Sequence, residues 1–180
     1  MKLAKIISGG QTGADQGALS ACLQCGFPYG GWIPRGRRTE KGKVPLRYRA
    51  LRQHRSRHYP PRTEANVEAA DGTVIFTFGK PDGGSLLTRA FARQHRKPCL
   101  HVDLNQPLEK GVARIVRWLK RNCPDECILN VAGSRRSKAP GIHMRVKKTI
   151  VVLLAEANRP SRRAQRAHLQ SNRLFCSCAR

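Results

Sequence analysis

Short apolar strand patterns and amphipathic helix patterns alternate along residues 1–157 of this 180-residue chain. Strands that alternate with helices pair in parallel, because each helix carries the chain back to the start of the next strand. The sequence therefore predicts a single α/β domain over residues 1–157, with a doubly wound, mainly parallel sheet as the middle of three layers. The predicted strands cover residues 3–8, 31–33, 73–78, 98–102 and 127–131, and the predicted helices cover residues 15–25, 63–70, 86–95, 108–122 and 142–157.

The first strand breaks into a glycine-rich turn, Ser8-Gly9-Gly10-Gln11-Thr12-Gly13, which leads into a helix. Glycines let a ligand approach the backbone closely, and the first amides of a helix are unpaired donors at the positive end of its dipole. The turn therefore suits an anion. It is neither a P-loop, which requires Gly-Lys-Ser/Thr, nor the G-x-G-x-x-G dinucleotide fingerprint. A tight connection without a ligand is the alternative interpretation.

A second glycine-rich turn, residues 79–85, follows the predicted strand 73–78 and also leads into a helix. In a doubly wound sheet, ligands bind beyond the carboxyl ends of the strands where the winding reverses. We expect both turns to share that crevice, with the hydroxyl groups of Ser85 and Thr88 as further donors. Helix capping by Ser85 is the alternative role for this segment.

The charge of the chain is strongly positive. Lys and Arg number 35 against 11 Asp and Glu, which gives a formal net charge of +24 and a pI near 11.2. A field of this sign attracts phosphorylated ligands, oxyanions, nucleic acid and acidic membrane surfaces without choosing among them. Residues 34–62 are rich in Arg and Lys with Glu40 as the only acid, and they predict an irregular surface loop. Residues 158–180 hold six arginines and no acid, and they predict a basic, mobile or loosely docked extension.

No signal peptide is apparent, and the longest apolar run, 150–155, is far below the roughly 20 residues that span a bilayer. We expect a cytoplasmic protein. The seven cysteines are then better interpreted as free thiols than as a disulfide framework. The pairs Cys22/Cys25, Cys123/Cys127 and Cys176/Cys178 have spacings that zinc sites also use, but their contexts are weak, and no structural metal is expected.

The chain contains five motifs in order, 8–15 (SGGQTGAD), 30–38 (GGWIPRGRR), 62–67 (RTEANV), 83–88 (GGSLLT) and 129–133 (LNVAG). Together they resemble the molybdenum cofactor carrier family. The resemblance covers residues 1 to about 157 and implies a Rossmann-like fold related to the SLOG and lonely-guy proteins, often as a homo-oligomer. It also implies a role in binding, protecting and delivering molybdenum cofactor, a phosphorylated pterin that holds oxo-molybdenum, to molybdoenzymes.

A carrier of such a cargo needs amide and hydroxyl donors for a phosphate and cations around the oxo-metal. We place the phosphate at the first glycine turn, with the second turn opposite. Three arginines are able to close over it, and residues of the last predicted strand and the turn after it complete the rim. Asp15 is interpreted as an acid of the first helical turn, and Thr63 and Asn66 as a helix cap and its neighbour. The predicted binding residues are Gly9, Gly10, Gln11, Thr12, Gly13, Arg35, Arg37, Arg38, Gly83, Gly84, Ser85, Thr88, Asn130, Gly133 and Arg135.

Two other functions remain alternatives. The related nucleoside-monophosphate phosphoribohydrolases carry a catalytic glutamate in a P-G-G-x-G-T-x-x-E turn, but the corresponding residues here end in Arg89-Ala90, so we expect a binding protein and not an enzyme. A nucleotide-binding or hydrolase role is the enzymatic alternative. Nucleic-acid binding is the other, because the chain is basic, although aromatic residues in the basic stretches form no stacking platform at readable spacing.

Overall fold

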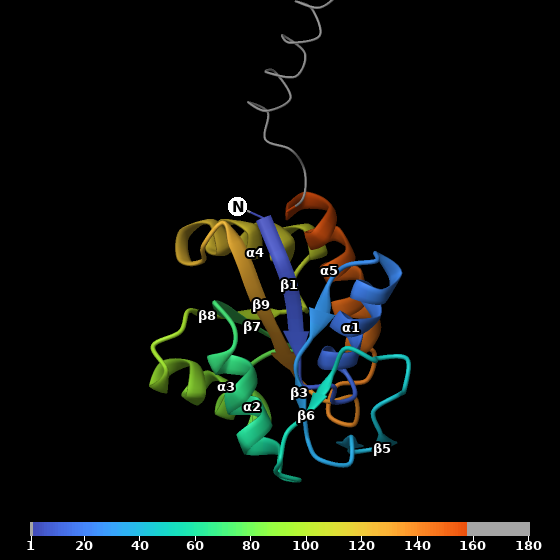
Figure 1. The fold of residues 1–180 in the computed structure, drawn as a ribbon. Coiled ribbons are helices and arrows are strands. Elements are labelled where there is room, and N and C mark those ends of the chain that lie inside the picture. Colours follow the sequence, from blue (N-terminus) through green and yellow to red (C-terminus); the bar gives the residue numbers. More distant parts are fainter. Residues whose placement is uncertain (1, 158–180) are drawn as a thin grey trace, which may run out of the picture.

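A five-stranded parallel sheet forms the centre of the computed structural model, which describes residues 2–157 (Figure 1). Its strand order is β2-β1-β9-β7-β8, and every pairing within it is parallel. The doubly wound α/β class predicted from the alternating pattern is therefore confirmed. The strands are β1 (Lys2–Ser8), β2 (Tyr29–Gly30), β7 (Gly72–Thr77), β8 (Cys99–Asp103) and β9 (Glu126–Gly133).

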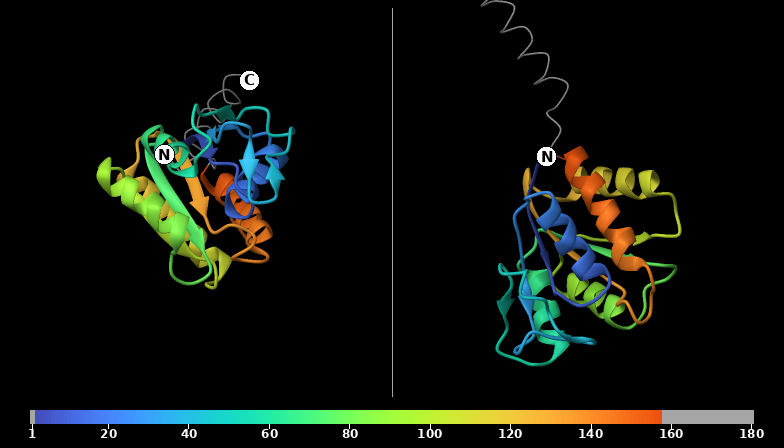
Figure 2. Two further views of the ribbon diagram at one scale, coloured as in Figure 1. Left: turned by 90° about the horizontal axis from the view of Figure 1, so that it is seen from below. Right: turned by 90° about the vertical axis from the view of Figure 1, so that its right-hand side faces the viewer.

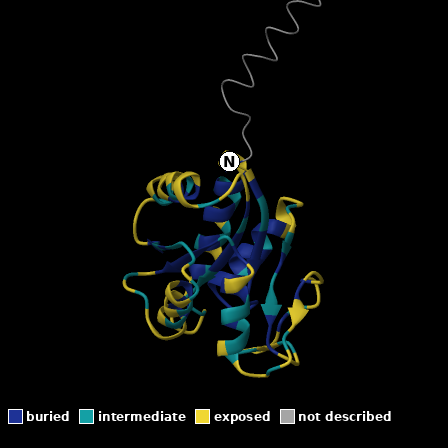
Figure 3. Cartoon of the chain, turned by 60° about the vertical axis from the view of Figure 1, so that its left-hand side comes forward, coloured by how far each residue is buried: buried dark blue, intermediate teal, exposed yellow. Residues whose placement is uncertain are grey.

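Helices cover both faces of the sheet (Figure 2). Helix α5 packs against α1 and α4, whereas α2 and α3 contact each other. All six residues of β7 are buried, as expected for a central strand with helices on both sides. Figure 3 shows the buried sheet between helices whose outer faces are exposed. The helices are α1 (Ala14–Gln24), α2 (Tyr59–Glu68), α3 (Gly83–Gln94), α4 (Leu108–Asn122) and α5 (Ile142–Ala157).

The strand order is that of a doubly wound sheet with a displaced starting point. If the five strands are numbered from β9 through β1, β2, β7 and β8, the sheet order becomes 3-2-1-4-5, the order of nucleotide-binding halves. Helix α5 then takes the place of the crossover between the first two strands, and it contacts β1 accordingly. The winding reverses between β9 and β7, so a ligand site is expected beyond the carboxyl ends of these two strands.

The basic segment after β3 (Trp32–Ile33) is anchored in a way that the sequence did not indicate. We expected an irregular surface loop over residues 34–62. Instead the segment contains β4 (Arg38–Thr39), β5 (Gly42–Lys43) and β6 (Arg52–Gln53), and its apolar side chains pack with α1 and β3 in a small second core, the core of the basic segment. Apolar side chains scattered among the arginines build this core, because they bury together even without a regular period. The core consists of Leu19, Ile33, Val44, Tyr48 and Leu51.

Several element boundaries differ from the sequence prediction. Helix α2 begins at Tyr59 rather than Thr63, with proline in its first turn, where the missing N–H is tolerated. Helix α3 begins at Gly83 rather than at residue 86. The predicted helix 108–122 is confirmed at both ends, and the predicted helix 142–157 is confirmed at its start.

The strand predicted at 31–33 corresponds to β3, which pairs with β6 and not with the main sheet, whereas β2, just before it, joins the main sheet. Among residues 2–157, no helix is long and apolar enough to cross a membrane. The basic extension 158–180, with Cys176 and Cys178, lies outside the described residues.

Candidate functional site

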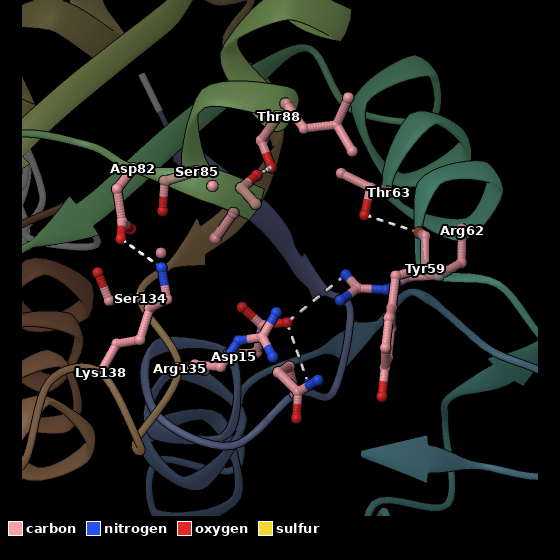
Figure 4. A pocket seen from close by; sticks show the side chains of 16 residues that line it. Asp15, Tyr59, Arg62, Thr63, Asp82, Ser85, Thr88, Ser134, Arg135 and Lys138 are labelled. Atoms are coloured by element: carbon pink, nitrogen blue, oxygen red, sulfur yellow. Dashed lines mark hydrogen bonds and ion pairs between the residues drawn. The ribbon is translucent and has the colours of Figure 1, made fainter. Parts of the chain in front are cut away.

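A small pocket opens beyond the carboxyl ends of β1, β7 and β9, where the sheet order predicts a ligand (Figure 4). Its volume is about 110 Å³. The first glycine-rich turn contributes Gln11 to its wall, and the second contributes residues 82–85. The lining residues are Gln11, Asp15, Tyr59, Arg62, Thr63, Asp82, Gly83, Gly84, Ser85, Leu87, Thr88, Ala132, Gly133, Ser134, Arg135 and Lys138.

Arg62 of helix α2 crosses the first glycine turn at Gly9. A Cβ at position 9 would overlap the Arg62 Nη1 atom and lie 2.5 Å from its Cζ atom, so only glycine leaves room for the guanidinium. The Nη1 atom lies 3.7 Å from Asp15 Oδ2, and the Arg62 side chain is 12% exposed. Its Nε atom is buried without a hydrogen-bond partner among residues 2–157. A buried guanidinium with an unused donor at a pocket wall is suited to an oxyanion.

Asp15 lies in the first turn of α1, as expected, but it is buried rather than solvated. Its carboxylate accepts a hydrogen bond from the Gln11 backbone N–H at 3.1 Å. Burial raises the pKa of Asp15 to about 6, although the charge of Arg62 and the Gln11 hydrogen bond act in the opposite direction. Burial likewise lowers the pKa of Arg62, against the charge of Asp15. For both groups, the loss of hydration therefore outweighs their mutual attraction.

The first turn of α3 forms the opposite wall. Asp82 is the N-cap residue, but its side chain does not cap the helix, because its carboxylate pairs with Lys138 Nζ at 2.5 Å. The amides of Ser85 and Leu86 donate to the Asp82 carbonyl oxygen, which leaves the amides of Gly83 and Gly84 without an acceptor among residues 2–157. Gly84 has open space at its Cβ position, and the buried Ser85 hydroxyl makes no hydrogen bond within residues 2–157. The turn thus offers donors to a ligand, and Ser85 does not serve as the cap.

The loop between β9 and α5 forms the third wall. Gly133 lies at the end of β9, where a Cβ would overlap the carbonyl oxygen of Phe76, so a larger residue could not keep this close approach of β9 and β7. Ser134 follows, and Arg135 reaches the rim with 41% of its side chain exposed. Lys138 also lines the pocket and forms an ion pair with Asp82. This wall adds cations at the mouth of the pocket.

Glu40, the only acid of the basic segment, fastens that segment beside the pocket. Its carboxylate accepts hydrogen bonds from the hydroxyl groups of Thr12 and Ser137 and from the Ser137 backbone N–H at 3.1 Å. Arg135 Nε lies 3.9 Å away. Burial alone would raise the pKa of Glu40, but the hydrogen bonds from Ser137 and Thr12 and the charge of Arg135 hold that pKa below its ordinary value. The Glu40 clasp, formed by Thr12, Glu40 and Ser137, therefore joins three loops.

The structure brings some of the predicted residues together in the pocket and leaves others outside its lining. Gly9 and Gly10 lie against Arg62 and the core of the basic segment, whereas Gly13 lies against the loop that follows β9. Thr12 belongs to the Glu40 clasp. The predicted residues that line the pocket are Gln11, Gly83, Gly84, Ser85, Thr88, Gly133 and Arg135.

The remaining predicted residues have other positions. Asn130 is buried in the sheet, where its amide contacts the Thr73 hydroxyl at 3.2 Å. Arg37 donates to the carbonyl oxygens of Val44, Pro45 and Tyr48, so it holds the basic segment together. Arg35 and Arg38 are exposed and do not line the pocket. The three arginines that we expected over the ligand are thus not gathered there.

Sequence reasoning missed Arg62, Tyr59, Asp82 and Lys138 as pocket residues. The place of Arg62 at the start of the segment RTEANV is the one signal in the sequence for its role in the pocket. Composition alone includes Arg62 in the predicted surface loop. Thr63 lines the pocket and donates its hydroxyl to the Tyr59 carbonyl oxygen one turn earlier in α2. It therefore lies inside the helix and is not the helix cap that we expected. Asn66 bridges to the backbone of Trp32 in β3, accepting at 2.8 Å and donating at 2.8 Å.

Metal-ligating side chains do not gather in the part of the chain that the structure describes. Within residues 2–157, no three His, Cys, Asp or Glu residues come together. All five cysteines there are free, and burial raises the pKa of the Cys22 thiol to about 12. Arg89 and Ala90, at the place of the phosphoribohydrolase glutamate, are exposed and do not line the pocket.

Comparison with known proteins agrees with the displaced strand order. Residues 6–154 match the model of the circularly permutated YpsA SLOG family. A crystal structure from Syntrophus aciditrophicus SB, of a protein named as a candidate molybdenum carrier, is 43% identical, with a TM-score of 0.80 over 84% of this chain and 95% of that one. No protein of curated function matches the chain. The chain therefore belongs to the circularly permutated YpsA branch of the SLOG family.

Proposed function

We propose that this protein is a non-catalytic carrier that binds molybdenum cofactor, or a similar phosphorylated ligand, through its phosphate group in the pocket at β1, β7 and β9. The observation that supports this proposal most directly is the position of Arg62. Its guanidinium lies over Gly9, and its buried Nε atom has no hydrogen-bond partner among residues 2–157. Arg62 lines the same pocket as the first turn of α3, which has no side-chain cap. A guanidinium facing free helix amides is an arrangement that recognises phosphate. The 43% identical protein named as a candidate molybdenum carrier supports the choice of cargo.

The size of the pocket limits what enters it. Its volume of about 110 Å³ is well below the roughly 300–1,000 Å³ of pockets that enclose drug-sized ligands. The pocket therefore suits a phosphate, and the pterin with its oxo-molybdenum would lie outside it. Arg135 and Lys138 line the pocket with side chains that are 41% and 52% exposed, so their charges can also reach a group outside it. Homo-oligomer formation and delivery to molybdoenzymes remain predictions of the resemblance.

Mass spectrometry of the small molecules released from freshly purified protein, with molybdenum measured in the same sample, tests this function. We expect pterin and molybdenum together, and Arg62→Met to lose both. Arg89→Met, an exposed arginine of α3 outside the pocket lining, should retain both and serves as the control. Protein that contains neither, and that takes up no cofactor supplied from outside, would contradict the carrier function.

One observation keeps a nucleotide hydrolase as the second candidate. Asp15 is a carboxyl group in the pocket whose pKa, raised by burial to about 6, lies in the range useful for acid and base catalysis. A nucleotide retained without molybdenum, and hydrolysed by water on incubation to free base and ribose phosphate, would favour this second function. Asp15→Asn should then abolish the release of base.

A further inference from the structure

Asp15 presents a carboxylate to the pocket in which we place an anion, so this inference rests on the proposed function. The side chain lines the same pocket as Arg62 and the first turn of α3, yet it is only 5% exposed. The Gln11 backbone N–H and Arg62 hold it from two sides. A ligand anion that binds Arg62 therefore arrives beside a buried group that carries the same charge.

The charged groups around Asp15 do not neutralise both anions. Helix α2 contributes Arg62, which lies over Tyr59 at 5.8 Å, and the loop after β9 contributes Arg135, which already lies near Glu40. Lys138, also in that loop, is paired with Asp82. Arg62 is thus the cation for which Asp15 and the ligand compete. Two like charges that share one buried site do not both stay ionised, and one of them takes up a proton.

We propose that Asp15 sets the charge state that the pocket accepts, because a dianionic oxyanion binds only together with one proton, held between the Asp15 carboxyl group and the ligand. The proton comes from solvent. The protonated carboxyl group then donates its O–H to a ligand oxygen, and the Arg62 guanidinium pairs with the ligand instead of with Asp15. No further charged residue is needed to balance the site.

This coupling makes affinity depend on pH. Below the pKa of Asp15 in the empty pocket, which burial raises to about 6, the carboxyl group already carries the proton and binding is tight. Above that pH the proton must be taken up, so affinity for a fixed dianion falls by about tenfold for each pH unit. Cargo is therefore held more tightly under acidic conditions and released as the pH rises.

Inorganic sulfate is the probe, because it stays a dianion between about pH 5 and pH 8 and isolates the titration of the protein. Isothermal titration calorimetry in two buffers of different ionisation enthalpy measures both the affinity and the number of protons taken up. For the wild-type protein at the upper end of the range, we expect uptake of about one proton per sulfate and the tenfold loss per pH unit.

Two isosteric variants separate Asp15 from other titrating groups. Asp15→Asn should bind sulfate with little dependence on pH, and near pH 8 it should bind about as tightly as the wild-type protein near pH 5. Glu68→Gln removes an exposed carboxylate of α2 that does not line the pocket, and it should retain the wild-type slope. Histidines that titrate elsewhere affect all three proteins alike.

The outcomes distinguish this inference from the proposed function. A flat pH profile for the wild-type protein, or an unchanged slope in Asp15→Asn, would overturn the role of Asp15 and leave the carrier function in place. Sulfate that fails to bind while a phosphate monoester binds would also overturn it alone. If neither anion binds at any pH, the anion pocket and the proposed function both fail.

Discussion

Substitution of Gly9 by alanine is the sharpest test of how the pocket is built, because it adds a single methyl group where the Arg62 guanidinium lies. The new Cβ would overlap Nη1 and lie 2.5 Å from Cζ of Arg62, and it would lie 3.0 Å from Asp15 Oδ2. The backbone at Gly9 is not in the left-handed region, so alanine is conformationally allowed there. The guanidinium therefore has to leave its position while the turn itself remains.

The two consequences have different sizes. Loss of hydrogen bonding from a charged group costs about 1.5–3 kcal/mol, which corresponds to a roughly 10- to 150-fold weaker binding of a phosphate ligand at about 1.4 kcal/mol per tenfold. Stability changes less, because alanine restricts the unfolded chain and so contributes about 0.4–1 kcal/mol in favour of folding. Loss of the Arg62–Asp15 pair offsets this gain. We therefore expect binding and stability to separate.

Calorimetric titration with a phosphate monoester, alongside thermal unfolding of the same samples, measures both effects. Gly111→Ala is the control, since Gly111 lies in α4 with its Cβ position 3.6 Å from Val102 Cγ1, an ordinary contact. It should bind as the wild-type protein does and gain about 1 kcal/mol from helix propensity. Wild-type affinity in a folded Gly9→Ala variant would refute the role assigned to Arg62.

Three further predictions concern stability. In the absence of ligand, the raised pKa of Asp15 means that the native state binds more protons than the unfolded chain between about pH 4 and pH 6. The free energy of unfolding should therefore fall by about 3 kcal/mol as the pH rises through that window, and denaturant titrations of Asp15→Asn should lack this decrease. Glu40→Ala opens the Glu40 clasp, and limited proteolysis should cut within residues 34–58 faster than in Glu68→Ala, an exposed acid of α2; equal rates would contradict the clasp. Phe76→Ala empties a fully buried site in β7 and should lower the free energy of unfolding by about 3–5 kcal/mol, whereas a loss below about 1 kcal/mol would contradict its core position.

Gly10 and Gly84 both lie in glycine-rich turns, but the structure needs glycine at the two positions for different reasons. Gly10 has φ +71° and its Cβ position lies 2.8 Å from Ile33 Cγ2, so a bulky residue there would disturb the core of the basic segment rather than block a ligand alone. Gly84 faces open space in the pocket wall, so a bulky residue there would obstruct the pocket and leave the fold intact. Only the second substitution reports on binding without a change in the fold.

The sequence by itself determined the alternation of strands and helices, the two helices at 108–122 and 142–157, and the positions of the two glycine turns. These features are local. Side-chain periodicity selects helix or strand within a few turns, and glycine marks the places where the backbone bends or a ligand approaches. The fold class followed because alternating elements leave few ways to pair strands in parallel.

Only the tertiary structure decided which residues meet. Arg62 reaches Gly9 and Asp15 across more than forty positions of sequence, and apart from its place in the segment RTEANV nothing near Arg62 distinguishes it from the other arginines of the basic segment. Glu40 and Ser137 join for the same reason. The order of strands decides such encounters, because β9, the last strand that the structure describes, stands between β1 and β7 and brings their turns and its own loop to one pocket.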